Sequence, residues 1–316
     1  MTEDHPILSN AVMNAEREAL SAENSARWPK AIQDPNNQGH PLFHVLWLAV
    51  NFLLIVSIFL AAYSAGWEFS TRRYLEGFSD AIVPATSPGD EKIEAILHWM
   101  AHGPARRSSG VEASQTDRDP TDTLNYDALL RVCGTATNAF INLVDTGGMQ
   151  ARRLLLMDSH QMTRHVVAEV LVDGRWIVVD PSFRVVLRGA DEKTLTREEL
   201  VDPAVFAAAT RNVKGYDSSY TYDHTVHIRL ARIRVFGALF RRILDRAFPG
   251  WEDTPTMTLL VERESFAALV ASFLLVIFLV LFRACLRWYG EKRLGVHSVR
   301  IRQQIRRACH AFLDAT

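Results

Sequence analysis

The chain has 316 residues, enough for one or two domains, and its 35 basic residues nearly balance 36 acidic ones, leaving a net charge of −1 at pH 7. A chain this close to neutral has no excess of Lys and Arg for binding phosphates, so we expect no nucleic-acid partner. Only one of the three cysteines, Cys133, lies between the two apolar runs described below, which excludes a disulfide scaffold in that region.

The first apolar run, Leu46 to Ala65, contains twenty residues without a charge. At 1.5 Å per residue such a helix spans roughly 30 Å, the thickness of a hydrocarbon core, so we predict a transmembrane helix over residues 43–66. Trp47 and Trp67 suit the interfacial belts of a bilayer. Residues 1–42 are polar and lack the apolar stretch of a signal peptide, so we expect a tail there. A buried core helix is the alternative for the apolar run.

The second charge-free run is Phe266 to Phe282, and Ala284 to Leu286 prolong it beyond Arg283. We therefore predict a second transmembrane helix over residues 265–286, in which Arg283 reaches toward the membrane surface. Two spans place both ends of the chain on one side of the membrane.

Charge predicts which side that is. Basic residues dominate the last segment, residues 287–316, so we expect both tails to be cytoplasmic and residues 67–264 to form an extracytoplasmic domain. Arg72, Arg73 and Arg263, which flank the spans on the domain side, favour the opposite orientation but are fewer.

Within the domain, a helix is expected after Gly89-Asp90, and it carries His98 and His102 at a spacing of four residues. Two such histidines could bind a metal ion, but no third ligand and no catalytic glutamate accompanies them. We therefore predict neither a metal site nor a cofactor, and we treat His224 and His227 in the same way. The polar loop Gly103–Thr123 follows, and we expect it either to border the site as a lid or to be disordered.

Cys133 opens a segment with helical spacing of apolar residues, and Gly147-Gly148 supplies a stop. The thiol therefore lies in the first turn of the predicted helix, where the positive end of the helix dipole favours the thiolate.

His165 and Asp180 lie on a predicted β-hairpin. Two runs rich in β-branched residues flank Asp173-Gly174, the strongest two-residue turn signal. A two-residue loop pairs Val172 with Arg175 and Leu171 with Trp176, and continuing the register brings Val167 opposite Asp180. Since side chains alternate between the two faces, His165 and Asp180 share a face as diagonal neighbours about 7–8 Å apart at the backbone. An imidazole and a carboxylate can bridge that distance.

The three residues have complementary chemistry. A thiol becomes a strong nucleophile as the thiolate, which a neighbouring imidazole stabilises, and a carboxylate orients that imidazole. We predict Cys133 as the nucleophile, His165 as the base and Asp180 as the orienting group of a thioester-forming site.

This stretch resembles the transglutaminase-like superfamily, whose members share with papain a cysteine-bearing helix packed against a sheet that carries histidine and aspartate. The matching pieces are Cys133-Gly134, Gly148 with Ala151-Arg152, His165 to Glu169, Asp173 to Trp176, and Asp180-Pro181-Ser182. Arg131 and Val167 depart from the common pattern, which bears on substrate preference.

The resemblance implies an α+β fold with a papain-like core between the two membrane helices. It also implies a cysteine enzyme, either an acyltransferase (transglutaminase) or a peptidase/amidase hydrolase, which needs no cofactor and acts on a peptide or protein. With the predicted topology, the substrate belongs to the cell envelope and the other partner is membrane lipid. Two alternatives stay open: the three residues coincide by chance, or the chain is a degenerate relative that serves as a binding or scaffold module in an envelope or exopolysaccharide assembly.

Two later segments have clear patterns. Residues 220–230 alternate between two faces as an amphipathic strand does, and the tyrosines of this strand either line a groove or pack against the next layer. Phe236–Phe248 is a basic amphipathic helix, which suits a lipid surface or the domain core. The tail segment Val296–Phe312 has the same basic amphipathic character.

Overall fold

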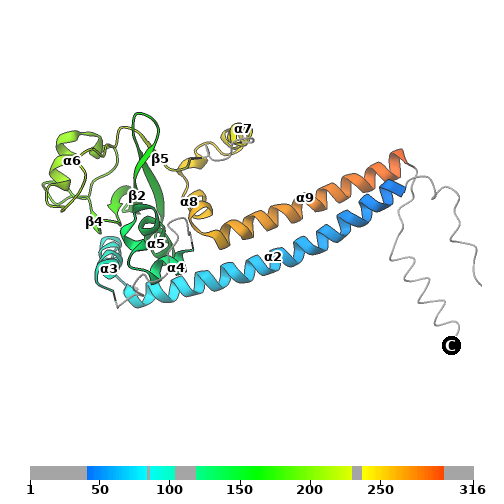
Figure 1. The fold of residues 1–316 in the computed structure, drawn as a ribbon, viewed down its shortest axis with the longest axis horizontal. Helices are drawn as coiled ribbons and strands as arrows, with labels where there is room; N and C mark the ends of the chain where they lie inside the picture. The colour runs from blue at the N-terminus through cyan, green and yellow to red at the C-terminus, as the bar shows by residue number, and fades with distance from the viewer. Residues whose placement is uncertain (1–40, 84–85, 104–118, 230–236, 295–316) are drawn as a thin grey trace, which may run out of the picture. The chain divides into compact units, whose positions relative to one another are not determined.

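The computed structural model describes residues 41–83, 86–103, 119–229 and 237–294. The fold is α+β, with a five-stranded antiparallel sheet, helices packed on it and two long apolar helices (Figure 1). The chain divides into two compact units, one formed by Ser57–Val276 and one that contains the described residues 41–56 and 277–294.

In chain order the elements are α2 (Pro41–Ile82), α3 (Gly89–His102), α4 (Pro120–Asn125), η2 (Leu129–Arg131), α5 (Cys133–Thr146), β1 (Ala151–Met157), β2 (Thr163–Val172), β3 (Arg175–Asp180), β4 (Val185–Val186), η3 (Glu199–Val201), α6 (Pro203–Thr210), β5 (Thr225–Val226), α7 (Gly237–Ala247), η5 (Trp251–Asp253), α8 (Pro255–Glu262) and α9 (Glu264–Arg293).

The helices α2 and α9 contain the two predicted spans, and both are long and apolar enough to cross a membrane. Only 11% of the most apolar stretch of α2 and 17% of that of α9 is buried, so neither stretch serves as the core of the sheet domain. This arrangement is compatible with a two-pass membrane protein whose domain lies between the spans.

Helix α2 does not end at residue 66, where the predicted span ends, but continues to Ile82. Hydropathy marks the end of an apolar run but does not end a helix, and Gly66 and Gly77 lie inside this one. Beyond the apolar run the helix joins the domain: Leu75 is fully buried and the Ser79 hydroxyl donates to the Leu143 carbonyl at 3.3 Å. Where the membrane boundary falls along α2 stays a prediction.

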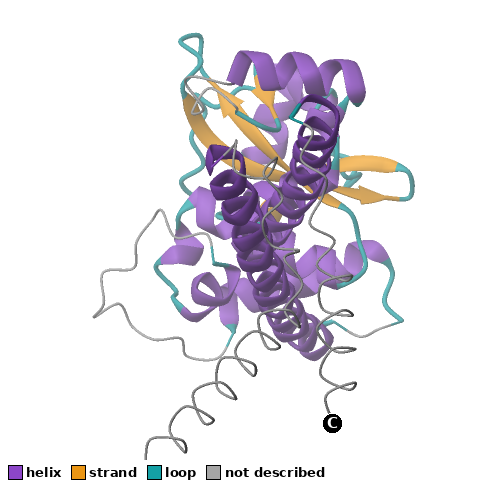
Figure 2. Ribbon diagram, turned by 90° about the vertical axis from the view of Figure 1, so that its right-hand side faces the viewer, coloured by secondary structure: helices purple, strands orange, loops and turns teal. Residues whose placement is uncertain are grey.

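The sheet has the strand order β4-β3-β2-β1-β5, with the long strand β2 at its centre. Figure 2 shows the strands in orange and the helices in purple. The β2–β3 hairpin has the predicted register, because Val172 pairs with Arg175 and Leu171 with Trp176. Asp173 and Gly174 have φ values of 48° and 80°, the left-handed values that a two-residue turn of this kind requires.

Both faces of the sheet are covered. On one face, Ala168, Val170 and Ile177 pack in a single cluster with Phe140 of α5, the helix that begins at Cys133. On the other face, Val167 and Val178 pack with a second cluster that contains Phe206 and Tyr222. His165 lies in β2 two residues before Val167, on the second face.

Of the strand expected over residues 220–230, residue 230 lies outside the described residues. In the described part, 220–229, only Thr225–Val226 form a strand and pair with β1, so the expectation is wrong for most of its length. A tight turn precedes them: the Asp217 carboxylate accepts from the Ser219 backbone N–H at 2.8 Å. The chain there curls over the sheet, and the side chain of Tyr222 is buried among apolar neighbours. Tyr222 belongs to the second cluster and Tyr220 packs against it. Packing at alternate positions also fits a strand, which is why the alternation was misleading.

Candidate active site

The thiol of Cys133 lies at the first residue of α5, as the spacing predicted. The residue before the helix, Val132, has no side chain that could cap the first turn, so the N–H groups there are free to stabilise negative charge. The helix is fixed to the sheet beside the site, because the Thr137 hydroxyl donates to the Val166 carbonyl at 3.1 Å. This contact joins the first turns of α5 to the residue that follows His165.

The thiolate form of Cys133 is favoured. Burial opposes ionisation, but the hydrogen bond and the positive charge of His165 outweigh it, with help from the backbone N–H groups of Val166 and Gly134. The net effect lowers the pKa of the thiol. Cys133 is itself partly exposed.

His165 and Asp180 form the hydrogen bond that the hairpin register predicted, with 2.6 Å between Nε2 and Oδ2. Both side chains are buried, at 3% and 0% exposure. The second carboxylate oxygen of Asp180 accepts from the backbone N–H and the hydroxyl of Ser182, at 3.1 and 2.7 Å. These bonds hold the carboxylate in place and explain why a serine two residues after the aspartate suits this site.

The imidazole is held in its charged form. Burial alone would lower the pKa of His165, but hydrogen bonds and negative charge from Asp180 and Cys133 outweigh burial and raise the pKa to about 9. Because Nε2 is engaged by Asp180, the other ring nitrogen is the one available to the thiol. The structure therefore brings together the three residues predicted from the sequence.

Glu169, the other carboxylate on the His165 face of β2, serves a different cluster. Its Oε2 accepts from Arg152 Nε at 2.7 Å and contacts His227 Nε2 at 2.7 Å. The other imidazole nitrogen of His227 contacts Asp253 at 2.6 Å, and the guanidinium of Arg152 lies 4.1 Å from the centre of the Trp176 ring. Arg152, Glu169 and Trp176, which are among the matching pieces of the sequence, thus stabilise this cluster and not the triad.

Sequence reasoning missed the aromatic surroundings of the imidazole. The ring of Tyr220 stacks flat on the ring of His165, with 4.4 Å between centroids and a 4° angle between planes. Phe183 and Tyr216 contact the same imidazole at steeper angles, with centroids 5.9 and 6.2 Å away. Of these three residues, only Tyr220 belonged to a predicted element, the strand whose tyrosines were expected to line a groove or to pack against the next layer.

The other candidate residues do not join this site. The rings of His98 and His102 lie 4.7 Å apart, and no group of three or more His, Cys, Asp or Glu within the described ranges is placed to hold a metal ion. Most of the Gly103–Thr123 loop, the tail before Pro41 and the Val296–Phe312 segment lie outside the described residues. The basic helix predicted over 236–248 is present as α7, and its contact with lipid stays a prediction.

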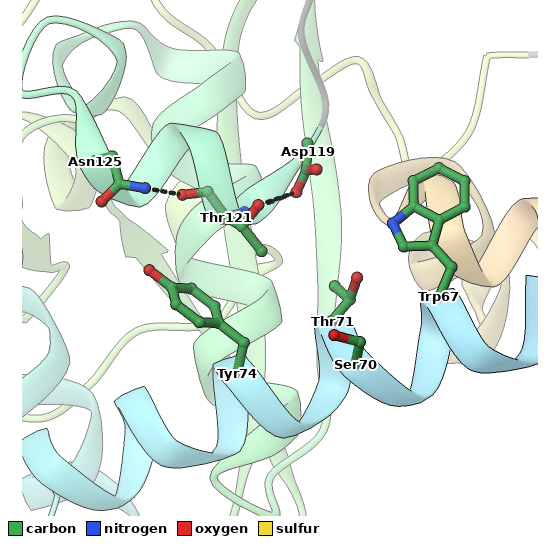
Figure 3. Close-up of a pocket in the computed structure, with 7 residues that line it drawn as sticks. All are labelled: Trp67, Ser70, Thr71, Tyr74, Asp119, Thr121 and Asn125. Carbon is green, nitrogen blue, oxygen red and sulfur yellow. Dashed lines mark hydrogen bonds between the residues drawn. The ribbon is translucent and has the colours of Figure 1, made fainter.

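A separate cavity of about 360 Å³ lies between α2 and α4 (Figure 3). Tyr74, Ser70 and Thr71 project into it from α2, and two hydrogen bonds link the residues that face them across the cavity. The complete lining is Trp67, Ser70, Thr71, Tyr74, Asp119, Thr121 and Asn125. None of these residues belongs to the triad, so the cavity and the thiol site are distinct features of the domain.

No protein-family model matches the chain, and no curated protein matches it. Function must therefore be inferred from the chemistry of the site.

Proposed function

We propose that the protein is a membrane-anchored cysteine enzyme of the transglutaminase-like kind, which transfers acyl groups or hydrolyses amides through a thioester on Cys133. The observation that carries the proposal is the position of His165, whose imidazole links a buried carboxylate to a thiol at the start of a helix. The order of the three residues and the arrangement of helix and sheet support a papain-like core.

The reaction follows from the charges in the site. The Cys133 thiolate attacks an amide carbonyl carbon and forms a C–S bond, and the backbone N–H at the helix start donates to the oxyanion, a contribution worth roughly 3 kcal/mol in comparable sites. The His165 imidazolium then donates its proton to the departing amine as the C–N bond breaks. The neutral imidazole next removes a proton from water or from a second amine, which attacks the thioester. The C–S bond then breaks, and the Cys133 thiolate leaves beside the imidazolium that has been formed again.

Water as the acceptor gives hydrolysis and an amine gives transamidation. We propose a peptide or protein of the cell envelope as the substrate, because the charge asymmetry of the chain favours an extracytoplasmic domain. The two long apolar helices support membrane lipid as the second partner.

A second candidate function has its own observation. The imidazole of His165 is only 3% exposed, so a leaving group must displace part of its cover to reach the proton. A degenerate relative that serves as a binding or scaffold module would tolerate a covered imidazole.

Thiol reactivity distinguishes the two. The full-length protein in detergent is treated with iodoacetamide near pH 6, where an ordinary thiol with a pKa of about 8.5 is almost entirely protonated, and modification of the Cys133 peptide is followed by mass spectrometry. The enzyme proposal predicts rapid modification of the wild type, and at least a tenfold slower reaction in His165→Gln, whose thiol has lost its cationic partner. A thiol-directed activity probe should label the wild type and not Cys133→Ala.

An ordinary thiol rate in the wild type, at equal folded yield, would favour the binding module. Asp173→Asn serves as the matched control, since it changes an exposed turn residue of the same hairpin and leaves the triad intact.

A further inference from the structure

One face of the His165 ring is covered by the side chain of Tyr220. Tyr220 lies parallel to the imidazole, 4.4 Å away and inclined by 4°, whereas the edge-on contacts of Phe183 and Tyr216 are longer and inclined by 63° and 80°. The hydrogen bond from Nε2 to Asp180 fixes one edge of the imidazole, and the Cys133 thiol interacts with it as well. A flat ring on the face of the imidazole opposes rotation out of the plane that these partners define.

The electronic character of the two rings makes this contact favourable for charge. The face of a tyrosine ring carries the negative part of its quadrupole and attracts a cation placed over it. His165 is the cation here, because Asp180 and Cys133 hold its proton. Tyr220 is partly buried, and burial together with the negative charges of Asp217, Cys133 and Asp180 raises the pKa of its phenol. The ring therefore stays neutral and keeps an electron-rich face.

The backbone holds Tyr220 in this position. Gly215 has a φ of 78°, which turns the chain before the tyrosines. The Tyr220 N–H then donates to the Asp217 carbonyl at 3.3 Å, and the Ser219 N–H donates to the Asp217 carboxylate at 2.8 Å. The ring of Tyr216, 5.7 Å from that of Tyr220, supports it from the side.

We propose that Tyr220 is a positioning residue, whose aromatic face holds the His165 ring in the plane shared by Asp180 and Cys133 and stabilises the imidazolium form. This inference rests on the proposed thiolate–imidazolium pair. The tyrosine affects the reactivity of the thiol through His165 and does not contact the substrate. The phenol hydroxyl has no part in it.

The groups that face His165 limit the alternatives. Asp180 from β3 and Cys133 from α5 are its hydrogen-bond partners. Tyr216 and Tyr220 come from the segment before β5, and the charge of Asp217 in that segment also acts on the imidazole. Since Asp217 is exposed, solvent screens its charge, which leaves the stacked ring as the strongest contact from that segment.

The test compares three side chains at one position. Tyr220→Phe keeps the ring and loses the hydroxyl, whereas Tyr220→Leu keeps an apolar cover and loses the aromatic face. The rate of Cys133 alkylation by iodoacetamide is measured against pH on the full-length protein in detergent. We expect Tyr220→Phe to follow the wild type, and Tyr220→Leu to raise the apparent pKa of the thiol, with about a tenfold slower reaction at pH 6.

The control Phe206→Leu removes an aromatic ring that contacts Tyr216 and Tyr222 and should leave the pH profile unchanged at equal folded yield. If the pH profile of Tyr220→Leu equals that of the wild type, the proposal is overturned, because any apolar side chain over the His165 ring would then serve as well as an aromatic one. An equally slow alkylation of Cys133 in Tyr220→Phe would also overturn the proposal, because the hydroxyl and not the ring would then be the group that acts on His165.

A second measurement separates this inference from the proposed function. In a Cys133→Ala background, His165 is titrated by NMR with ¹³C-labelled histidine, and its signal is assigned by its loss in His165→Gln. The pKa of His165 should be lower with Tyr220→Leu than with Tyr220→Phe. If it is lower while the wild-type thiol reacts as an ordinary one, the stacking role stands and the enzyme proposal fails. If it is equal, the stacking role fails whatever the thiol does.

Discussion

The imidazole of His165 lies between a carboxylate and a thiol, and these two partners set the pH range in which the site can work. The carboxylate and the thiol raise the pKa of His165 to about 9. The imidazole in turn lowers the pKa of the Cys133 thiol. A group with a raised pKa keeps its proton below that value and loses it above, so the imidazolium is present up to about pH 9. We therefore expect a bell-shaped pH dependence of acyl transfer, with its basic limb near pH 9 and its acidic limb below the usual pKa of a thiol.

The measurement compares turnover with alkylation of the same thiol across the pH range. Alkylation needs the thiolate but no general acid, so its rate should not fall above about pH 9 while turnover does. Turnover that rises steadily through about pH 10 would show that no protonated imidazole takes part.

The two buried carboxylates of the hairpin should respond differently to neutralisation. Asp180→Asn removes the negative charge that orients the imidazole and holds its proton, so turnover should fall roughly 10²–10⁴-fold, with some activity left because nucleophile and base are still present. Glu169→Gln weakens the contacts with Arg152 and His227, and we expect about 3 kcal/mol lower stability with little change in turnover per folded molecule. Thermal unfolding and turnover at equal folded yield measure both effects. A Glu169→Gln variant that loses more turnover than Asp180→Asn would mean that Glu169 is the carboxylate on which the imidazole depends.

At the scale of elements, the β2–β3 turn fixes the register that brings His165 to Asp180. Gly174 has a φ of 80°, a region in which a side chain costs about 1–2 kcal/mol. We expect Gly174→Ala to lower the free energy of unfolding by about that amount, and Asp173→Asn to change it by less than about 0.5 kcal/mol because asparagine suits the first position of such a turn. Thermal denaturation of the two variants tests this. Equal stability of both would show that the turn relaxes without cost.

The hairpin could be predicted because its register is local: a two-residue loop determines every later pair, and the side-chain alternation follows. The same is true of α5, where apolar spacing and Gly147 mark both ends of the helix. The helix carries Cys133 and the hairpin carries His165 and Asp180. The contact between His165 and Asp180 could therefore be predicted from the sequence, because both residues belong to one hairpin.

Contacts between residues distant in sequence could not be predicted in this way. His227 contacts Glu169, from which it is separated by 58 positions in the sequence, and no local pattern encodes that pairing. The stacking of Tyr220 on His165 was missed for a related reason: an alternating segment satisfies the pattern of a strand whether it pairs with a neighbour or curls over a site. The length of α2 was missed because composition reports where the apolar run ends and says nothing about where the helix ends.

At the scale of the whole molecule, a buried ionic cluster joins the long helices to the helix that bears the thiol. Arg263, between α8 and α9, donates from Nε to Asn142 at 2.7 Å and pairs with Glu68 of α2 at 3.1 Å and Asp145 of α5 at 2.7 Å. The Ser265 hydroxyl donates to the other oxygen of Glu68 at 2.6 Å. Removing the guanidinium would leave two carboxylates without their buried cation.

We therefore expect Arg263→Met to destabilise the unit Ser57–Val276 by about 3–5 kcal/mol, the usual effect of breaking a buried ion pair on one side. The matched control is Arg72→Met on α2, whose pair with Glu76 is largely exposed and worth at most about 0.5 kcal/mol. Thermal unfolding of the detergent-solubilised protein measures both. If the two variants are equally stable, the cluster is hydrated and contributes little.

The last prediction concerns the orientation of the chain in the membrane, which follows from the two apolar helices and from the distribution of charge. Both long helices have the length and apolarity of a span, and an even number of spans leaves both ends of the chain on one side. Basic residues gather after the second apolar run and face few acidic ones, so this end should stay in the cytoplasm. These residues are Arg283, Arg287, Lys292, Arg293, Arg300, Arg302, Arg306 and Arg307, against Glu291 and Asp314.

Cysteine labelling in intact cells tests the orientation. One variant carries Lys214→Cys, an exposed position of the domain, and the other keeps only the native Cys309 of the tail, with the remaining cysteines replaced by alanine in both. A membrane-impermeant maleimide should label the domain position and not the tail, and both should react after the cells are permeabilised. The reverse pattern would place the thiol site in the cytoplasm. A substrate of the cell envelope would then be excluded, although the chemistry proposed for Cys133, His165 and Asp180 would be unaffected, because that chemistry depends on contacts within the domain and not on the side of the membrane it faces.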